Sequence, residues 1–317
     1  MKQDPPFCVQ VELTEGCNLF CSFCGIHGIR EKPGNYKFMN VQLAMILAKQ
    51  LQNTGWLPRI EFAMHGEPLL NKNAKEIIKV FRKRLPNCQL MLTSNGMPVQ
   101  NSANQEVSEL LDAGLNILAI DDYGQPAISK IKTKLPRDLW AEYPSETDSP
   151  HKRWSKKTKK IIFIEDIRKS EKGGHSKLIN HCGCADKPLR KPLKARCAKP
   201  FRELSVRWDG NVAICCNDFR GVYKCGNITD QGVNELWQNE AFTAARKLLY
   251  NYQRAFAPCN ICNSKSYRVG LLPDKLGKRE MPEPSKIDKE MAFSASKGSA
   301  YSPVILRPWE TSWPWKV

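Results

Sequence analysis

The stretch Glu15-Gly16-Cys17-Asn18-Leu19-Phe20-Cys21-Ser22-Phe23-Cys24 holds three cysteines in C-x3-C-x2-C spacing. Three thiols in one short loop can all turn toward a single metal centre, whereas a structural zinc site takes four ligands, usually as two separated pairs. A [4Fe–4S] cluster bound by three cysteines keeps one iron free of protein ligands, and a substrate or cofactor can coordinate that iron. The loop with Cys17, Cys21 and Cys24 is therefore predicted to be a reaction centre.

Alternating strand and helix patterns surround this loop. Residues 7–13 alternate between apolar and polar side chains, which predicts a strand that ends at the cysteine loop. Repeated βα units predict an α/β fold with a parallel sheet, whose functional loops follow the carboxyl ends of the strands. Further strands are expected at 60–64, 89–93, 116–121 and 160–165, with helices at 41–52, 73–84 and 105–112.

Two further motifs lie at such carboxyl ends, namely Gly66-Glu67-Pro68 and Thr93-Ser94-Asn95-Gly96. Together with the cysteine loop, and in this order, they resemble the signature of the radical S-adenosylmethionine (SAM) superfamily. The resemblance implies a partial, open (β/α)6-type parallel barrel, with a sixth strand expected near residues 178–179. A zinc knuckle or a set of buried free thiols is the alternative interpretation of the cysteine loop.

The resemblance also implies roles for the site residues. Cys17, Cys21 and Cys24 would be the catalytic cluster ligands, and SAM would chelate the fourth iron. Glu67 would accept a charge-assisted hydrogen bond from the SAM ammonium. Cleavage of SAM would give a 5′-deoxyadenosyl radical that takes a hydrogen atom from the substrate, with flavodoxin or ferredoxin as electron donor. The SAM-contacting residues would be Gly66, Glu67, Pro68, Thr93, Ser94 and Asn95.

Residues 197–264 form a predicted second unit. Two alternating strands at 204–208 and 211–215 flank Asp209-Gly210, which is a strong hairpin signal. Helices follow at 233–237 and 241–250, and Cys259-Asn260-Ile261-Cys262 closes the unit. This arrangement resembles the auxiliary-cluster extension of radical SAM enzymes, the SPASM domain, in its short twitch form.

The second resemblance implies that Cys197, Cys215, Cys259 and Cys262 bind a second [4Fe–4S] cluster. A cluster with four thiolates has no open iron, so electron transfer or structural bracing is its expected task. The alternative is a four-cysteine zinc site, because zinc ribbons share this architecture. Four other cysteines leave the ligand choice open: Cys216 and Cys225 could replace Cys215, and Cys182 and Cys184 are predicted to line the approach to the unit.

The charge and the cysteine content of the sequence predict its cellular compartment and its binding partners. The sequence has no apolar segment at the N-terminus and no apolar run of 18 residues, so we expect a cytoplasmic protein without a membrane span. In such a protein the thirteen cysteines favour metal ligation over disulfides. The net charge is +17, and residues 125–200 hold 20 Lys and Arg against 8 Asp and Glu. This basic stretch predicts either a polyanion-binding surface or a solvated lysine-rich surface.

The predicted domains are a barrel at 1–196 with a basic, loop-rich insertion at about 123–159, an auxiliary unit at 197–264, and an irregular tail at 265–317. The tail carries Trp309, Trp313 and Trp315, which would either stack on nucleobases or pack back on the barrel. These boundaries follow the loss of a helical or strand period after residue 122 and again after residue 264.

The favoured substrate hypothesis is a hypermodified thymine base in DNA that undergoes radical isomerisation, with residues 125–200 binding the DNA. It depends on the positive charge and on analogy with viral base-hypermodification enzymes. The enzymatic alternatives are a peptide maturase and a dehydrogenase of small molecules of the amino-sugar type. A zinc-containing nucleic-acid-binding protein is the non-enzymatic alternative, but it leaves Glu67 and the βα pattern unexplained.

Overall fold

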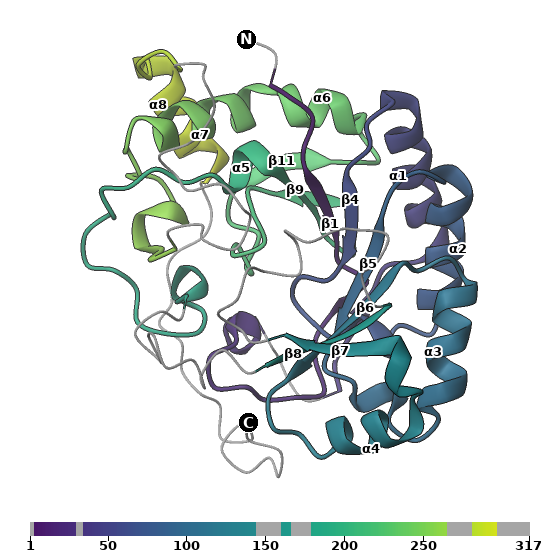
Figure 1. Ribbon diagram of the computed structural model, residues 1–317. Helices are drawn as coiled ribbons and strands as arrows, with labels where there is room; N and C mark the ends of the chain where they lie inside the picture. Colours follow the sequence, from purple (N-terminus) through teal and green to yellow (C-terminus); the bar gives the residue numbers. More distant parts are fainter. Residues whose placement is uncertain (1–2, 30–33, 144–159, 166–178, 265–280, 297–317) are drawn as a thin grey trace.

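A nine-stranded sheet is the centre of the computed structural model, which describes residues 3–29, 34–143, 160–165, 179–264 and 281–296 (Figure 1). Its strand order is β11-β10-β9-β1-β4-β5-β6-β8-β7, and the strands from β9 to β7 in this order pair in parallel. The expected partial parallel barrel is therefore confirmed. The strands are β1 (Cys8–Val11), β4 (Arg59–Phe62), β5 (Leu90–Ser94), β6 (Ile117–Asp122), β7 (Trp140–Tyr143), β8 (Ile161–Glu165), β9 (Glu203–Val206), β10 (Asn211–Ala213) and β11 (Lys224–Asn227).

Four helices cover one face of this sheet (Figure 1). They are α1 (Val41–Thr54), α2 (Ala74–Arg84), α3 (Ala103–Asp112) and α4 (Ala127–Lys134). Helix α1 begins where the Asn40 side chain accepts a hydrogen bond from the Leu43 amide, and it ends at Gly55, whose φ of 70° suits glycine. Its apolar stripe packs into the main hydrophobic core with alternate side chains of the strands, such as Ile60 and Phe62.

The other face of the sheet is partly polar. Register and the two-residue pleat place Gln10, Glu61 and Ser205 side by side on this face. Toward β6 and β8 the same face becomes apolar and carries a small separate cluster of Met91, Ile117, Ala119 and Ile162. Buried polar groups cost free energy unless they are paired, so a polar barrel interior indicates a binding surface rather than a packing surface.

The predicted loop-rich insertion is wrong in its first part, because α4 and the edge strand β7 lie within it. Helix α4 is short and lies between Pro126 and Pro136, which concealed its period. Strand β7 contributes Trp140, whose ring packs edge-on against that of Phe163, with 5.3 Å between the ring centroids. Residues 144–159 lie outside the described residues. The parallel strands beyond the five predicted for the barrel are thus β7 and β9, whereas Ile179 is not in a strand and residue 178 is outside the described residues.

The predicted hairpin exists, and it extends the barrel sheet. Strand β9 pairs in parallel with β1, while β10 and β11 add antiparallel strands at the edge. Gly210 makes the turn between β9 and β10 at a φ of 83°, close to the side chain of Asn227. Above this edge lie α5 (Lys199–Arg202), α6 (Val233–Gln238) and α7 (Glu240–Tyr250). The auxiliary region is therefore continuous with the barrel.

Part of the predicted irregular tail is a helix, α8 (Lys286–Ala295), which packs against α7. It begins with a capping box between Ser285 and Asp288, and Lys247 of α7 pairs with the Asp288 carboxylate at 2.9 Å. Half of its ten residues are polar, so the apolar period was too weak to predict it. The Trp-rich segment lies outside the described residues. Within the described residues, no helix is long and apolar enough to span a membrane.

Candidate active site

The three-cysteine loop lies at the carboxyl ends of the barrel strands, directly against the Gly66-Glu67-Pro68 motif. It follows β2 (Thr14–Glu15), which pairs with β3 (Lys37–Phe38) in a small separate sheet. Backbone hydrogen bonds join Gly16 to His65 and Glu67, at 3.3 and 3.0 Å. A Cβ at position 66 would collide with the carbonyl oxygens of Thr14 and Gly16, so only glycine permits this approach.

Local hydrogen bonds hold the cysteine loop in shape. The Cys24 amide donates to the Cys21 carbonyl at 2.9 Å, and the Leu19 amide donates to the Cys17 sulfur at 3.4 Å. The His27 ring contacts the Cys21 carbonyl through Nε2 at 2.9 Å, so this histidine holds the loop through its backbone. Sulfurs positioned by backbone contacts of this kind fit the ligands of a metal cluster.

The structure brings the three predicted motifs together. Ser94 donates its hydroxyl to Glu67 Oε1 at 2.9 Å, and the Asn95 amide donates to Glu67 Oε2 at 2.7 Å. The Asn95 side chain reaches the cysteine loop, where Nδ2 lies 3.5 Å from the Cys17 sulfur and 2.8 Å from Asn18 Oδ1. Two motif residues lie beside these contacts: Thr93 is half-buried in β5, and Pro68 is buried at the start of a 3-10 turn.

Glu67 is a fully buried carboxylate in an unusual setting. Burial raises its pKa to about 7, and the hydrogen bonds from Asn95, Leu69 and Ser94 oppose that shift only in part. The groups that favour its ionised form are therefore neutral donors. A cationic ligand group at this position would add the missing positive charge, and the ammonium of SAM has that charge.

We expect Glu67→Gln to weaken SAM binding about 10- to 100-fold, because a charge-assisted hydrogen bond contributes roughly 1.5–3 kcal/mol. In the unmodified protein, affinity for SAM should fall as pH drops from 8 to 6, since the carboxyl becomes neutral below its pKa of about 7. The Gln variant should lose this part of the pH dependence. Isothermal titration of the reconstituted protein at several pH values measures both effects, and an equal pH profile in the two proteins would contradict the role.

The four cysteines predicted for the auxiliary cluster gather at one place. Cys197 precedes α5, Cys215 follows β10, and Cys259 and Cys262 flank a 3-10 turn, η9 (Cys259–Ile261). All four are buried. Cys215 interacts electrostatically with Cys197 and Cys259, and Cys259 interacts in the same way with Cys262. Burial raises the pKa of the Cys215 and Cys259 thiols, as expected for thiols that become thiolates only with a bound cation.

Two of the spare cysteines have other partners. The Cys216 sulfur lies 3.1 Å from the buried Lys199 ammonium, which also pairs with Glu203 at 3.2 Å. Cys225 lies on β11, where its charge interactions are with Asp218 and Arg246. This placement favours Cys215 as the ligand from the turn.

A zinc ion and an iron–sulfur cluster require different spacings of the four sulfurs. In the described residues no group of three or more Cys, His, Asp or Glu converges closely enough to hold one metal ion. A zinc ion requires all four sulfurs at about 2.3 Å from one point. An iron–sulfur cube gives each thiolate its own iron and so separates the sulfurs more widely.

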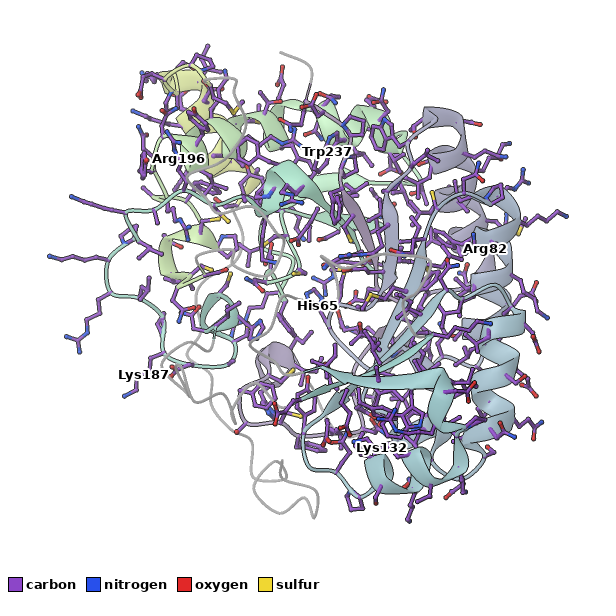
Figure 2. The ribbon with its side chains drawn as sticks, viewed as in Figure 1. His65, Arg82, Lys132, Lys187, Arg196 and Trp237 are labelled. Atoms are coloured by element: carbon purple, nitrogen blue, oxygen red, sulfur yellow. The ribbon has the colours of Figure 1, made fainter. Side chains whose placement is uncertain are left out.

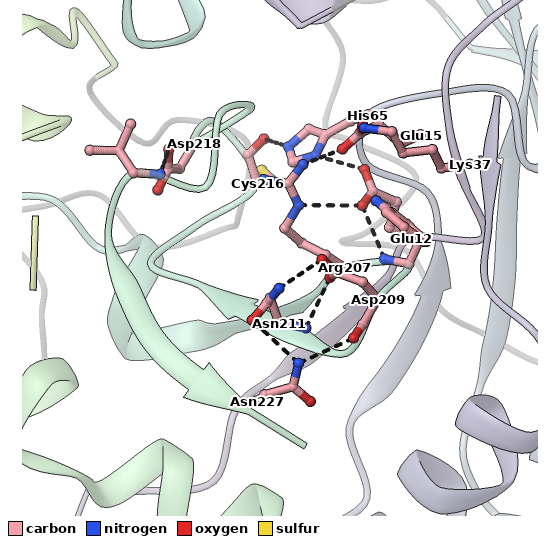
Figure 3. Close-up of polar contacts among 12 residues, drawn as sticks. Glu12, Glu15, Lys37, His65, Arg207, Asp209, Asn211, Cys216, Asp218 and Asn227 are labelled. Carbon is pink, nitrogen blue, oxygen red and sulfur yellow. Dashed lines mark hydrogen bonds and ion pairs between the residues drawn. The ribbon is translucent and has the colours of Figure 1, made fainter. Parts of the chain in front are cut away.

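A buried charge network that the sequence did not predict joins the two cysteine sites (Figure 3). Glu12, which follows β1, holds His65 Nδ1 at 2.7 Å and Arg207 Nε at 3.6 Å. Arg207 also pairs with Glu15, two residues before Cys17. The other ring nitrogen of His65 contacts the Cys216 carbonyl at 2.9 Å, next to Cys215. The only sequence signal was a polar residue at alternate positions of strands 7–13 and 204–208.

Comparison with known families agrees with this geometry. Residues 11–121 match the family model of the radical SAM superfamily, and residues 197–263 match the SPASM model, an iron–sulfur cluster-binding domain. The chain therefore contains a radical SAM domain and a SPASM domain. Its cofactors are therefore SAM and [4Fe–4S] clusters, one open and one auxiliary, as the two resemblances implied. These matches leave the zinc alternatives unsupported.

Individual relatives cover different parts of this radical SAM chain. It is 26% identical over 265 residues to the S-adenosyl-L-methionine-dependent 2-deoxy-scyllo-inosamine dehydrogenase of Niallia circulans. This match covers 82% of the present chain and 94% of the relative. A GTP 3′,8-cyclase of Mycobacterium marinum is 29% identical over 109 residues, 34% of this chain and 29% of the relative. The crystal structure of BtrN with AdoMet and 2-DOIA shares the fold, with a TM-score of 0.66 at 22% identity over 86% of this chain and 98% of BtrN.

Proposed function

We propose that this protein is a radical SAM dehydrogenase that oxidises a secondary alcohol of a small polyhydroxylated amine, an amino sugar or an aminocyclitol, to a ketone. The observation that carries the proposal is the match to the 2-deoxy-scyllo-inosamine dehydrogenase, because it spans the barrel and the auxiliary region together. The match to the GTP 3′,8-cyclase is confined to about a third of the chain.

The DNA hypothesis loses its support. The families and relatives named above do not include a DNA-modifying enzyme or an isomerase. Much of the basic stretch, residues 144–159 and 166–178, lies outside the described residues. Within the described part, Lys132 pairs with Glu142, Lys199 pairs with Glu203, and Lys134 donates to the Asn101 carbonyl at 2.6 Å. These three amines bind partners within the protein, and Lys199 is buried, so none of the three supports a phosphate-binding surface.

In the proposed function, the open cluster, SAM and the auxiliary cluster have separate sets of ligands. Cys17, Cys21 and Cys24 would hold the open cluster, and Glu67, Ser94 and Asn95 would bind and orient SAM beside it. Cys197, Cys215, Cys259 and Cys262 would hold the auxiliary cluster. When bound, these cofactors supply the one-electron chemistry, namely abstraction of a hydrogen atom and acceptance of the remaining electron. The boundary between the two units, near residue 197, remains a prediction.

Oxidation of an alcohol also releases the hydroxyl proton, and the Glu12–His65 pair is suited to receive it. His65 lies near the centre of the molecule (Figure 2), and both of its ring nitrogens face acceptors, the Glu12 carboxylate and the Cys216 carbonyl. The neutral ring donates to one of these acceptors, and its other nitrogen is the base that takes up the proton; the protonated ring then donates to both. The polar interior beside Glu12, with Gln10 and Ser205, suits a substrate rich in hydroxyl groups.

The substrate experiment uses 2-deoxy-scyllo-inosamine with deuterium on its carbinol carbons. We expect the reduced, reconstituted enzyme to form a ketone and to transfer one deuterium into 5′-deoxyadenosine, as read by mass spectrometry. Parallel reactions contain other amino sugars, thymine-modified DNA and peptides. Label transfer from DNA or a peptide, with only uncoupled background from every amino sugar and aminocyclitol, would overturn the proposal.

A His65→Gln variant separates hydrogen-atom abstraction from proton release in the same assay. Gln retains hydrogen bonding but cannot take up the proton. Deuterium transfer should persist while the yield of ketone per 5′-deoxyadenosine falls. If the ratio stays at the level of the unmodified enzyme, the Glu12–His65 pair does not receive the proton.

A further inference from the structure

A short basic segment, residues 186–196, leads directly to the first auxiliary cysteine, and we call it the basic loop. It contains five Lys and Arg and one acid, Asp186. Four of its cations are exposed, and among the described residues they pair with no acid: Lys187, Arg190, Lys191 and Lys194. A patch of exposed charge of one sign attracts a partner of the opposite sign.

Hydrogen bonds hold the first part of the basic loop against the Cys259–Cys262 loop. The Leu189 amide donates to the Ile261 carbonyl at 3.1 Å. The Asn180 side chain donates to the same carbonyl at 2.8 Å and to the Lys187 carbonyl at 3.2 Å. Because Ile261 lies between Cys259 and Cys262, the exposed cations have a fixed position beside two of the assigned cluster ligands.

The end of the basic loop is fixed as well. The buried Arg254 side chain donates to the carbonyls of Ala195 and Arg196, both at 2.8 Å. The Arg196 guanidinium stacks on Tyr250 and Tyr252, with 4.1 and 4.8 Å between its carbon and the ring centroids. Tyr252 is 48% exposed, so an aromatic surface adjoins the cations. Aromatic side chains and Arg are enriched at protein–protein interfaces.

The position of the basic loop suits the removal of an electron. The proposed function leaves one electron on the auxiliary cluster in every turnover, and the next turnover requires the oxidised cluster. An oxidant must therefore reach this side of the molecule, where Figure 2 shows Lys187 and Arg196, opposite Arg82 of α2. A nucleic acid would also match the charge of the loop, but it cannot accept the electron.

We propose that the basic loop is the docking surface of an acidic one-electron carrier protein, which takes the electron from the reduced auxiliary cluster. The cluster loses one electron, and the flavin or iron–sulfur centre of the carrier gains it. Complexes of electron carriers bury little surface, and opposite charges speed their association. The inference rests on the proposed function, which places a redox-active cluster beside this loop.

The test measures electron transfer from a chain that retains only the auxiliary cluster, because Cys17, Cys21 and Cys24 are replaced by Ala. This protein is reduced with titanium(III) citrate, freed of the reductant and mixed by stopped flow with an oxidised bacterial flavodoxin as the acidic carrier. The second-order rate constant should fall as ionic strength rises from about 0.01 to about 0.15 M. At low ionic strength it should fall about tenfold or more when four residues are changed to Glu, namely Lys187, Arg190, Lys191 and Lys194.

Four exposed lysines on or beside α1 and α2 provide the matched control. Changing them to Glu alters the net charge by the same amount on the helix face, and should lower the rate constant much less than the loop variant does. They are Lys49, Lys72, Lys79 and Lys83. An equal fall in the two variants would overturn the proposal, because net charge and not the basic loop would then determine the rate.

Iron analysis and electron paramagnetic resonance of the reduced protein separate this inference from the proposed function. About four irons per chain, with an unchanged rate constant in the loop variant, would overturn docking at the loop and leave the proposed function standing. A parent chain that forms no redox-active cluster would overturn both. If the Glu variant loses iron, the same four residues are changed to Gln, which should give an intermediate rate constant. Charge reversal that abolishes binding of a single-stranded DNA oligomer but not electron transfer would assign the loop to nucleic acid instead.

Discussion

Replacing Cys17, Cys21 and Cys24 together with Ala is expected to abolish SAM cleavage and to halve the iron content, from about eight to about four atoms per chain. The effect should be complete because the open iron is the only position at which SAM is bound next to its electron source. The hydrogen bonds from Leu19 and Asn95 to the Cys17 sulfur would lose their acceptor, yet they are local to the loop. The fold should therefore survive.

The measurement combines iron and sulfide analysis after anaerobic reconstitution with chromatographic detection of 5′-deoxyadenosine. Cys88→Ala is the matched control, because Cys88 is buried in the main core as a small apolar residue and lies on the helix side of the sheet. It should keep all the iron and full SAM cleavage. A triple variant that still cleaves SAM would be incompatible with the assigned reaction centre.

The parts of the site that depend on short sequence motifs could be predicted. The cysteine loop, Gly66-Glu67-Pro68 and Thr93-Ser94-Asn95 each follow a predicted strand, and carboxyl ends of neighbouring parallel strands meet at one edge of a sheet. Their juxtaposition follows from the βα pattern alone. Their mutual hydrogen bonds, such as that from Ser94 to Glu67, required coordinates, because both side chains were expected to contact SAM instead.

The charge network around Glu12 could not be predicted, because its members are far apart in the sequence. Glu12 and Arg207 meet through the pairing of β1 with β9, which was assigned to a separate unit. The attachment of the turn that carries Cys182 to the Cys259–Cys262 loop, through Asn180 and Ile261, likewise joins residues that are far apart in the sequence. Long-range pairing is the information that local patterns lack.

Changing both Cys259 and Cys262 to Ser is expected to leave SAM cleavage by dithionite intact and to reduce ketone formation to background. The open cluster has its own ligands, so hydrogen-atom abstraction should continue. The substrate radical, however, would retain the electron that the proposed function passes to the auxiliary cluster. The variant should also lose about half of its iron. Anaerobic product analysis gives the ratio of ketone to 5′-deoxyadenosine, and Cys225→Ala, a buried cysteine of the same region, is the control that should behave like the parent.

Stability decides between this outcome and a merely structural metal site, because a small domain held together by zinc unfolds without its metal. In this protein the Cys259–Cys262 loop is also held by hydrogen bonds that do not involve a metal. The buried Arg254 side chain donates to the carbonyls of Ala195, Arg196 and Ser264 at 2.8–2.9 Å and so ties the segment before Cys197 to the segment after Cys262. The double variant should accordingly remain folded by circular dichroism and lose only a few degrees of thermal stability. Global unfolding together with loss of SAM cleavage would show that the cluster braces the fold, and electron acceptance would then need another site.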